Sequence, residues 1–173
     1  MKKNRFLLAC GYNDTIMAQV TVGITTYNRS EFLKATLECF LAQTNVPDEI
    51  IVYENCSTDN TAQMVKKMQE RAPFIQYVRS VHHEQKYLTN VSRLIRKARY
   101  PYFLYAQDDD WWHPEFLEKL TRTLDGNPDY GAIMCWFRDH RTFPFSPNEP
   151  ETVYKHHYTN LPHRKVYADM MRM

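Results

Sequence analysis

Apolar positions along the chain follow two alternating periods, which predict strands and helices in turn. Short runs of β-branched and aromatic residues are typical of strands and occur at residues 19–25, 49–53, 74–78, 102–106 and 130–137. Between them, apolar side chains recur at helical spacing over residues 30–43, 60–71, 91–98 and 114–124. This strand–helix repetition predicts an α/β fold with a mostly parallel sheet and right-handed crossovers.

Local signals predict where several helices begin. Ser30 precedes the first helical pattern and is expected to be its N-cap, and residues 57–59 are expected to cap the second helix. Pro114 is suited to the first turn of the fourth helix. Pro73 and Pro101 follow the second and third helices.

Polar segments follow three of the predicted strands, at residues 25–28, 54–57 and 107–110. In a parallel sheet, ligands bind at the carboxyl ends of the strands, so these segments are expected to meet at one edge. The last segment contains three adjacent carboxylates, which repel one another. A divalent cation that also carries phosphate oxygens would offset that charge; the alternative is a solvated acidic loop that caps the next helix.

Composition narrows the class of protein. With 173 residues, 43% hydrophobic and 24% charged, the chain is expected to form one globular domain, residues 1–173. A net charge of +2 gives no signal for a nucleic-acid partner. The four cysteines, Cys10, Cys39, Cys56 and Cys135, form no C-x-x-C pair, so neither a zinc site nor a disulfide framework is expected. Without an apolar run of membrane-spanning length, we expect a cytoplasmic protein; peripheral membrane contact and oligomerisation stay open.

Three blocks of sequence, residues 20–30, 50–59 and 102–115, closely resemble the family-2 glycosyltransferases of the GT-A fold. The resemblance covers roughly residues 20–137 and implies a Rossmann-like fold that binds a nucleotide-diphosphate sugar. It also implies transfer of the sugar to an acceptor hydroxyl with inversion, assisted by Mn²⁺ or Mg²⁺. The acceptor, whether glycan, lipid-linked or protein, is left open.

The resemblance assigns roles to individual residues. Asp109 matches the carboxylate that binds the metal, and Asp108 matches the position that faces the ribose. Thr25 and Tyr27 match the first-strand motif that contacts the nucleotide base. Asn55 stands where many members place the second Asp of an Asp-Asp-Gly-Ser motif. Its amide can still hydrogen-bond a base edge but supplies no charge, which leaves the identity of the base open.

Three further positions near these motifs have expected roles. Lys86, in the loop after the third strand, is expected to contact phosphate. Asp110 is expected to cap the helix that begins near His113, with a metal contact as the alternative. Of the adjacent Trp111 and Trp112, at least one is expected to pack in the core.

The catalytic base is the missing part of the expected site. An inverting transfer needs a carboxylate to accept the proton of the acceptor hydroxyl, and in the family that carboxylate lies in the acceptor half. Residues 138–173 are expected to be a loop and tail in place of much of that half, so the base is unknown. Asp139, Glu149 and Glu151 are candidates, although each is typical of an ordinary surface acid. The alternative function is a nucleotide-sugar-binding module without transferase activity.

Overall fold

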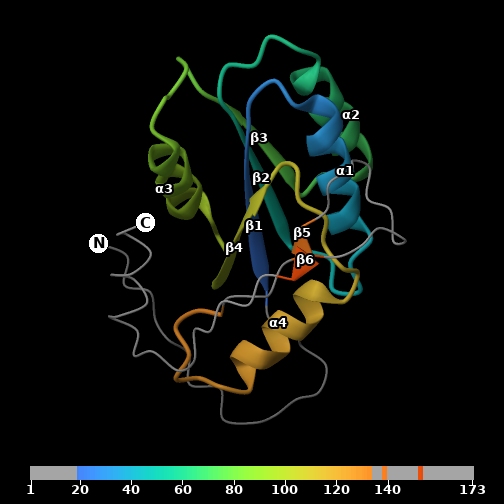
Figure 1. Cartoon of the computed structure of the whole chain (residues 1–173), viewed down its shortest axis with the longest axis vertical. Helices are drawn as coiled ribbons and strands as arrows, with labels where there is room; N and C mark the ends of the chain where they lie inside the picture. The colour runs from blue at the N-terminus through green and yellow to red at the C-terminus, as the bar shows by residue number, and fades with distance from the viewer. Residues whose placement is uncertain (1–18, 134–137, 140–151, 154–173) are drawn as a thin grey trace.

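The computed structural model describes residues 19–133, 138–139 and 152–153 (Figure 1). Strand and helix alternate through four β–α repeats, as predicted. The elements are β1 Val20–Thr26, α1 Ser30–Leu41, β2 Glu49–Glu54, α2 Thr61–Arg71, β3 Ile75–Arg79, α3 Tyr87–Lys97, β4 Tyr102–Gln107, α4 Phe116–Asp125, β5 Arg138–Asp139 and β6 Thr152–Val153.

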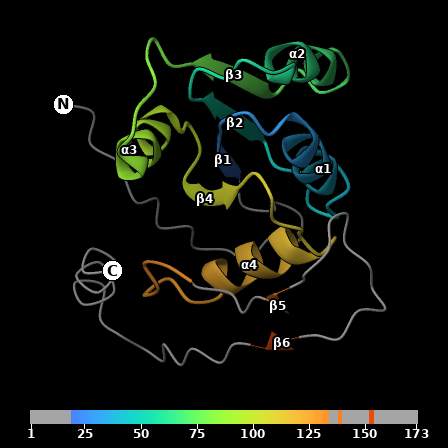
Figure 2. The same ribbon diagram turned by 45° about the horizontal axis from the view of Figure 1, so that its top comes forward.

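The main sheet has the strand order β3-β2-β1-β4, and every pair in it is parallel. The chain moves outward from β1 to β3 and then returns to place β4 on the other side of β1. Right-handed crossovers in opposite directions put the connecting helices on opposite faces, so α1 and α2 cover one face and α3 the other (Figure 2). The order reverses between β1 and β4, and such a reversal is where open α/β sheets bind ligands.

The core lies on both faces of the sheet, as the strand β2 shows. Its side chains alternate, so that Ile50 and Val52 pack in the cluster under α1 and α2, while Ile51 and Tyr53 pack with Leu94 of α3. A strand buried on both faces needs a continuous apolar run, which explains the composition of the central strands.

A close approach on the α3 face depends on Gly23 of β1. A Cβ atom at this position would lie 2.7 Å from the ring of Phe103 and 3.3 Å from the Cβ of Leu94. The absent side chain therefore makes room for the packing of α3 and β4 against β1.

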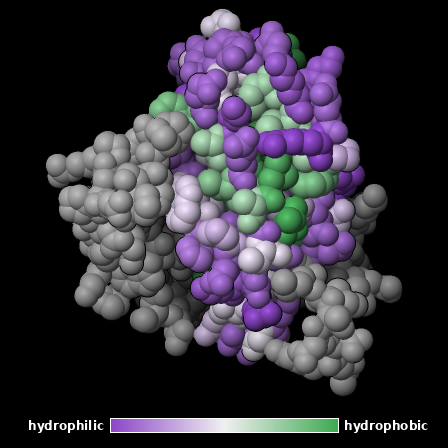
Figure 3. All heavy atoms as spheres, turned by 90° about the vertical axis from the view of Figure 1, so that its right-hand side faces the viewer, coloured by the Kyte–Doolittle hydropathy of each residue, from purple (hydrophilic) through white to green (hydrophobic). Residues whose placement is uncertain are grey.

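The side of the molecule on which α1 and α2 lie carries some apolar surface. Figure 3 shows hydrophobic atoms near the centre of this face, with hydrophilic residues around them. The exposed apolar side chains of the described residues include Phe32 of α1 and Val46 of the loop that follows it. Surface of this kind does not define a function by itself.

The prediction of a strand at residues 130–137 is wrong for residues 130–133, which form no strand. Residues 134–137 lie outside the described part of the chain. Tyr130 lies in a turn after α4, where its amide donates to the carbonyl of Asn127 at 2.9 Å. This turn uses the backbone amide that a sheet partner would need. The next strand, β5, begins at Arg138 and pairs antiparallel with β6.

Candidate functional site

The acidic triplet follows β4 directly and lies beside the end of β1, because Thr25 is opposite Gln107 in the sheet. Asp108 is buried, whereas the other two acids are exposed. The hydroxyl of Thr36 in α1 lies 3.0 Å from the carbonyl oxygens of both Asp108 and Asp110. Thus α1 fixes the backbone of the triplet at the point where the sheet order reverses.

Arg29 forms ion pairs with Asp108 and Asp109, the first two acids of the triplet. Its Nη1 donates to Asp109 Oδ2 at 2.6 Å and to Asp108 Oδ1 at 3.3 Å. Arg29 is not among the site residues predicted from the sequence. A signal was available, since Arg29 lies just after the first-strand motif, and the expected topology brings that motif next to the acids.

Two acids of the triplet, Asp108 and Asp110, have raised pKa values. Burial raises the pKa of Asp108, although the charge of Arg29 partly counters this effect. Partial burial of its carboxyl group and the charges of Asp109 and Asp108 raise the pKa of Asp110. More positive charge at this position would favour the ionised form of Asp108 and Asp110.

The residues present fit a divalent cation that is shared with a substrate. One nitrogen of Arg29 reaches both Asp108 and Asp109, so a single cation can also lie within reach of both carboxylates. Within the described part of the chain, no group of three or more His, Cys, Asp or Glu side chains could hold a metal. Mg²⁺ commonly binds through one or two carboxylates plus substrate phosphates, which matches this donor set.

Thr25 and Tyr27 lie at the end of β1, where the sequence placed them. The hydroxyl groups of Thr25 and Tyr105 share a hydrogen bond of 2.7 Å. Tyr27 is 45% exposed, and its ring lies 4.4 Å from that of His83, centre to centre, at 53°. The Tyr27 ring therefore has a face available at this edge, and His83 adds a second aromatic group that the sequence analysis did not identify.

Asn55 lies at the end of β2 and is buried, with its amide engaged by the loop after β3. Its Nδ2 donates to the carbonyl of Glu84 at 2.9 Å, and its Oδ1 accepts from the amide of Glu84 at 2.8 Å. His83 Nδ1 lies 3.2 Å from the Asn55 carbonyl. Asn55 thus positions the loop that carries His83, and its amide keeps one hydrogen and one lone pair for any ligand.

Lys86 follows the same loop and is the exposed residue just before α3. Its backbone amide donates to Glu84 Oε1 at 3.0 Å. The residue therefore lies beyond the carboxyl end of β3, at the edge of the sheet that carries the other predicted residues.

Glu54, which ends β2, belongs to the interior rather than to the site. Its carboxylate is fully buried and accepts hydrogen bonds from the Tyr77 hydroxyl at 2.9 Å and from the Ser57 amide, with Arg79 at 3.4 Å. Burial and the bond to Glu54 raise the pKa of Tyr77 to about 12. Glu54 therefore ties β2 to β3 and to the loop that follows it.

The loops after β1 and β2 are held to each other. Asn28 has a φ of 53°, in the left-handed region that Asn tolerates. Its amide donates to Ser57 Oγ at 2.9 Å, and its Oδ1 accepts from the Thr58 amide at 2.7 Å. Two of the segments expected to meet at this edge are therefore in direct contact.

The expectation that Ser30 caps α1 is wrong by one residue, because Ser30 is the first helical residue and Arg29 precedes it as the cap. The Ser30 amide donates instead to Asp59 Oδ2 at 3.0 Å, while Asp59 Oδ1 accepts from the Thr61 amide at 3.1 Å. Although partial burial opposes it, these bonds lower the pKa of Asp59. One carboxylate thus satisfies amides at the start of both α1 and α2.

The expectation that Asp110 caps the fourth helix is also wrong. The cap position of α4 is Glu115, which makes no capping bond with its own side chain. The Glu115 amide donates to His113 Nδ1 at 3.2 Å, and the Leu117 amide donates to Gln43 Oε1 at 3.0 Å. Because these groups satisfy the amides at the start of α4, the carboxylate of Asp110 is not needed there.

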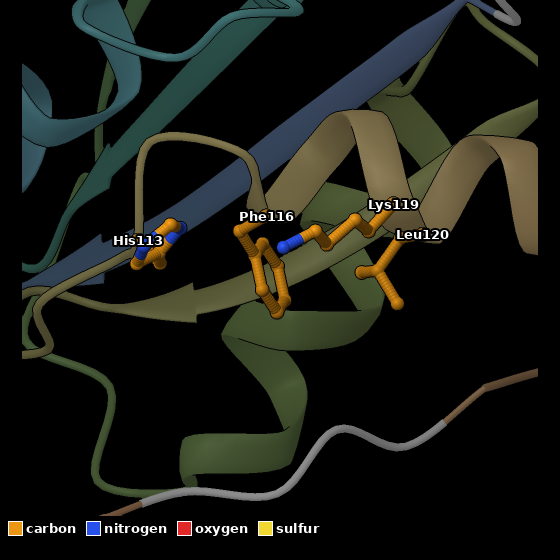
Figure 4. A pocket seen from close by; sticks show the side chains of 4 residues that line it. All are labelled: His113, Phe116, Lys119 and Leu120. Atoms are coloured by element: carbon orange, nitrogen blue, oxygen red, sulfur yellow. The ribbon is translucent and has the colours of Figure 1, made fainter.

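Of the two tryptophans after the acids, Trp112 packs in the core, as expected. Its ring lies 5.4 Å from Phe40 and 4.7 Å from Phe116, centre to centre, while Trp111 is 48% exposed. A hollow of about 290 Å³ lies nearby, on the surface of α4 (Figure 4). Its lining residues, none of which is a predicted site residue, are His113, Phe116, Lys119 and Leu120.

The structure does not describe the side chains of the three candidate catalytic bases. Glu149 and Glu151 lie outside the described residues. The backbone of Asp139 forms part of β5, opposite Thr152.

Two other expectations concern the described part of the chain. Cys39 and Cys56 are both free thiols, while Cys10 and Cys135 lie outside the described residues. Within the described ranges, no helix has the length and apolar character that a membrane span requires.

Comparison with known proteins decides the family. The family model described as glycosyl transferase family 2 matches residues 21–168, most of the chain. The chain belongs to glycosyl transferase family 2. An uncharacterized glycosyltransferase of Nostoc sp. is 27% identical over 116 residues, which cover 66% of this chain and 35% of the relative. An uncharacterized glycosyltransferase of Mycoplasma genitalium is 22% identical over 152 residues, covering 86% and 51%.

Solved structures show that this family-2 chain has the GT-A fold, which confirms the prediction from the sequence. The mannosyltransferase PcManGT of Pyrobaculum calidifontis matches with a TM-score of 0.63 and 24% identity, over 70% of this chain and 36% of that one. TarS of S. aureus matches with a TM-score of 0.59 and 21% identity, over 64% and 33%. The family-2 chain described here thus spans about a third of the length of these proteins and of the Nostoc relative.

Proposed function

We propose that this family-2 glycosyltransferase binds a nucleotide-diphosphate sugar at the carboxyl edge of its sheet and transfers the sugar with the help of a divalent cation. The observation that carries the proposal is the position of Asp108 and Asp109, side by side where the strand order reverses between β1 and β4. Structures of two proteins with the same fold support it. PcManGT was solved with GDP-Man and Mn²⁺, and TarS was solved with UDP and with UDP-GlcNAc.

In the proposed site, the residues divide between the metal and the nucleotide. Asp109 binds the cation, with Asp110 as a second contact, and Asp108 faces the ribose. The exposed ring of Tyr27 packs against the base beside Thr25, since both lie at the end of β1.

Two residues of the neighbouring loops complete the donor side of the proposed site. Lys86, exposed beyond the end of β3, contacts the phosphates. Asn55 contributes through the part of its amide that Glu84 does not use and holds the loop of His83 in place.

The proposed chemistry is an inverting transfer. When bound, Mn²⁺ or Mg²⁺ supplies Lewis-acid stabilisation of the negative charge that develops on the diphosphate leaving group. The protein residues hold the donor so that its phosphates lie next to Asp109. A carboxylate on the acceptor side takes the proton of the attacking hydroxyl; Asp139, Glu149 and Glu151 are the candidates in this chain.

Calorimetric titration of UDP-, GDP- and dTDP-sugars, with and without Mn²⁺, tests the donor site. We expect at least one donor to bind in a Mn²⁺-dependent manner, and Asp109→Asn to weaken that binding by about 100-fold, as loss of metal-site groups does. Asp129→Asn is the matched control, because Asp129 is an exposed acid in the turn after α4. Equal Mn²⁺-dependent binding by Asp109→Asn and the unmodified protein would refute the proposed site.

A second candidate function is donor binding without transfer. It requires only the donor-side residues at the carboxyl ends of β1, β2 and β4, all of which lie in the described part of the chain. Incubation of a bound donor with an acceptor mixture, with release of the nucleoside diphosphate as the readout, separates the two functions. Turnover supports the transferase, and tight binding without donor hydrolysis or transfer supports the binding module.

A further inference from the structure

Arg29 already places a positive charge on the two acids assigned to the donor site. Its Nη1 is the donor to both carboxylates, at 2.6 Å from Asp109 Oδ2 and 3.3 Å from Asp108 Oδ1. The Asp108 side chain is only 8% exposed, so water compensates little for the charge of this carboxylate. Arg29 therefore acts as the counter-ion of the acidic pair in the donor-free protein.

The positions of Arg29 and a bound cation conflict. A cation bound by Asp109 would share this carboxylate with Arg29, whose Nη1 donates to Asp109 Oδ2 at 2.6 Å. The guanidinium and the metal also repel each other at this distance. Binding of the metal therefore requires Arg29 to leave its present contacts.

Arg29 is able to move and has a suitable new partner. Its side chain is 49% exposed, and it precedes the first turn of α1, with its guanidinium 5.9 Å from the centre of the Phe32 ring. A donor diphosphate bound to the metal at Asp109 would bring phosphate oxygens next to it. The planar guanidinium is well suited to binding phosphate through two hydrogen bonds.

We propose, on the basis of the donor site proposed above, that Arg29 exchanges partners during binding: it holds Asp108 and Asp109 before the donor arrives and the diphosphate afterwards. The exchange couples the two ligands. Metal alone must displace Arg29 without providing it with a new anion, whereas metal and nucleotide together provide one. Each ligand then strengthens the binding of the other, by the same factor in both directions.

Replacement of Arg29 separates its two roles, because they predict opposite changes. With Arg29→Gln, Mn²⁺ alone is expected to bind about tenfold more tightly, since the competing charge is gone. The same variant is expected to bind UDP or GDP about tenfold more weakly in saturating Mn²⁺, since a phosphate contact is lost. Arg29→Lys keeps the positive charge, so Mn²⁺ without nucleotide should bind this variant as weakly as it binds the unmodified protein. The variant should still lose part of the affinity for the nucleotide, because lysine lacks the planar guanidinium.

A matched control tests whether the loss of any surface arginine has these effects. Arg71 is 54% exposed and lies 3.0 Å from Glu38, so Arg71→Gln removes a similar ion pair on α2. Calorimetry with Mn²⁺, and then with UDP or GDP in saturating Mn²⁺, is applied to all variants, and circular dichroism confirms that each is folded. Arg71→Gln should match the unmodified protein in both titrations.

The outcomes distinguish this inference from the proposed donor site. If the unmodified protein binds the Mn²⁺–nucleotide pair and Asp109→Asn does not, the donor site stands. In that case, an Arg29→Gln variant whose affinity for Mn²⁺ alone is unchanged or reduced overturns the exchange of partners. If the unmodified protein binds none of UDP, GDP and dTDP with Mn²⁺, the donor site and the exchange both fail.

Discussion

Replacing Gln43 by alanine is expected to destabilise the fold, because its side chain links α1 to the start of α4. The Gln43 side chain, in a residue that is only 4% exposed, accepts from the Leu117 amide at 3.0 Å and donates to the His113 carbonyl at 2.7 Å. Leu117 is buried, so an amide left there without a partner costs about 1–3 kcal/mol. Loss of the bond to the exposed His113 adds about 0.5–1.5 kcal/mol.

Together these losses predict a decrease of about 3 kcal/mol in the free energy of unfolding, which corresponds to about 6–12 °C in Tm for a chain of this size. Urea unfolding measures the decrease, provided that the m-value is unchanged. Gln43→Glu keeps an acceptor for the Leu117 amide and should lose less. Gln63→Ala, at an exposed position of α2, is the control and should change stability by under about 0.5 kcal/mol. A loss that small in Gln43→Ala would refute the capping role.

Two further predictions concern the packing and pH dependence of the fold. Gly23→Ala places a Cβ 2.7 Å from the Phe103 ring and 3.3 Å from Leu94, so we expect a loss of about 1–3 kcal/mol in urea unfolding; unchanged or increased stability would contradict this packing. The pKa of Asp59 is lowered in the folded protein. Its carboxylate therefore stabilises the fold at any pH above 3.8, the ordinary pKa of an aspartate, and this stabilisation is lost as the pH falls through the lowered pKa. The stability difference between Asp59→Asn and the unmodified protein should therefore shrink from neutral to strongly acidic pH, and a difference independent of pH would rule out this linkage.

The regular elements of the fold followed from local patterns. The periods of apolar residues gave β1 to β4 and α1 to α4 with ends that differ by a few residues at most. These patterns succeed because each strand or helix buries a face that its own sequence defines. The expected strand at residues 130–137 had the composition of a strand but lies partly in a turn, and composition alone does not show whether a neighbouring strand is available to pair.

The sequence predicts that the three polar segments meet at one edge of the sheet, but not the hydrogen bonds between them. Parallel topology places the segments after β1, β2 and β4 at one edge, and Asn28 confirms contact between the first two. The capping partners could not be found from neighbouring residues, because Asp59 lies 29 positions from Ser30 and Gln43 lies 74 positions from Leu117. Arg29 differs from these cases: its partners are about 80 positions away, but the predicted topology already brings the first-strand motif next to the acids.

The pairing of β4 with β1 has a consequence for the order of folding. Residues Thr25 and Tyr105, which share a hydrogen bond across this pair, are 80 positions apart, whereas β1, β2 and β3 follow one another along the chain. Closing the longer loop costs more chain entropy, and contacts of high sequence separation slow folding. The acids after β4 meet Arg29 only when this strand docks. If the proposed donor site binds a nucleotide, it is complete only after this distant strand pairing, and ligand affinity during refolding would report the docking of β4.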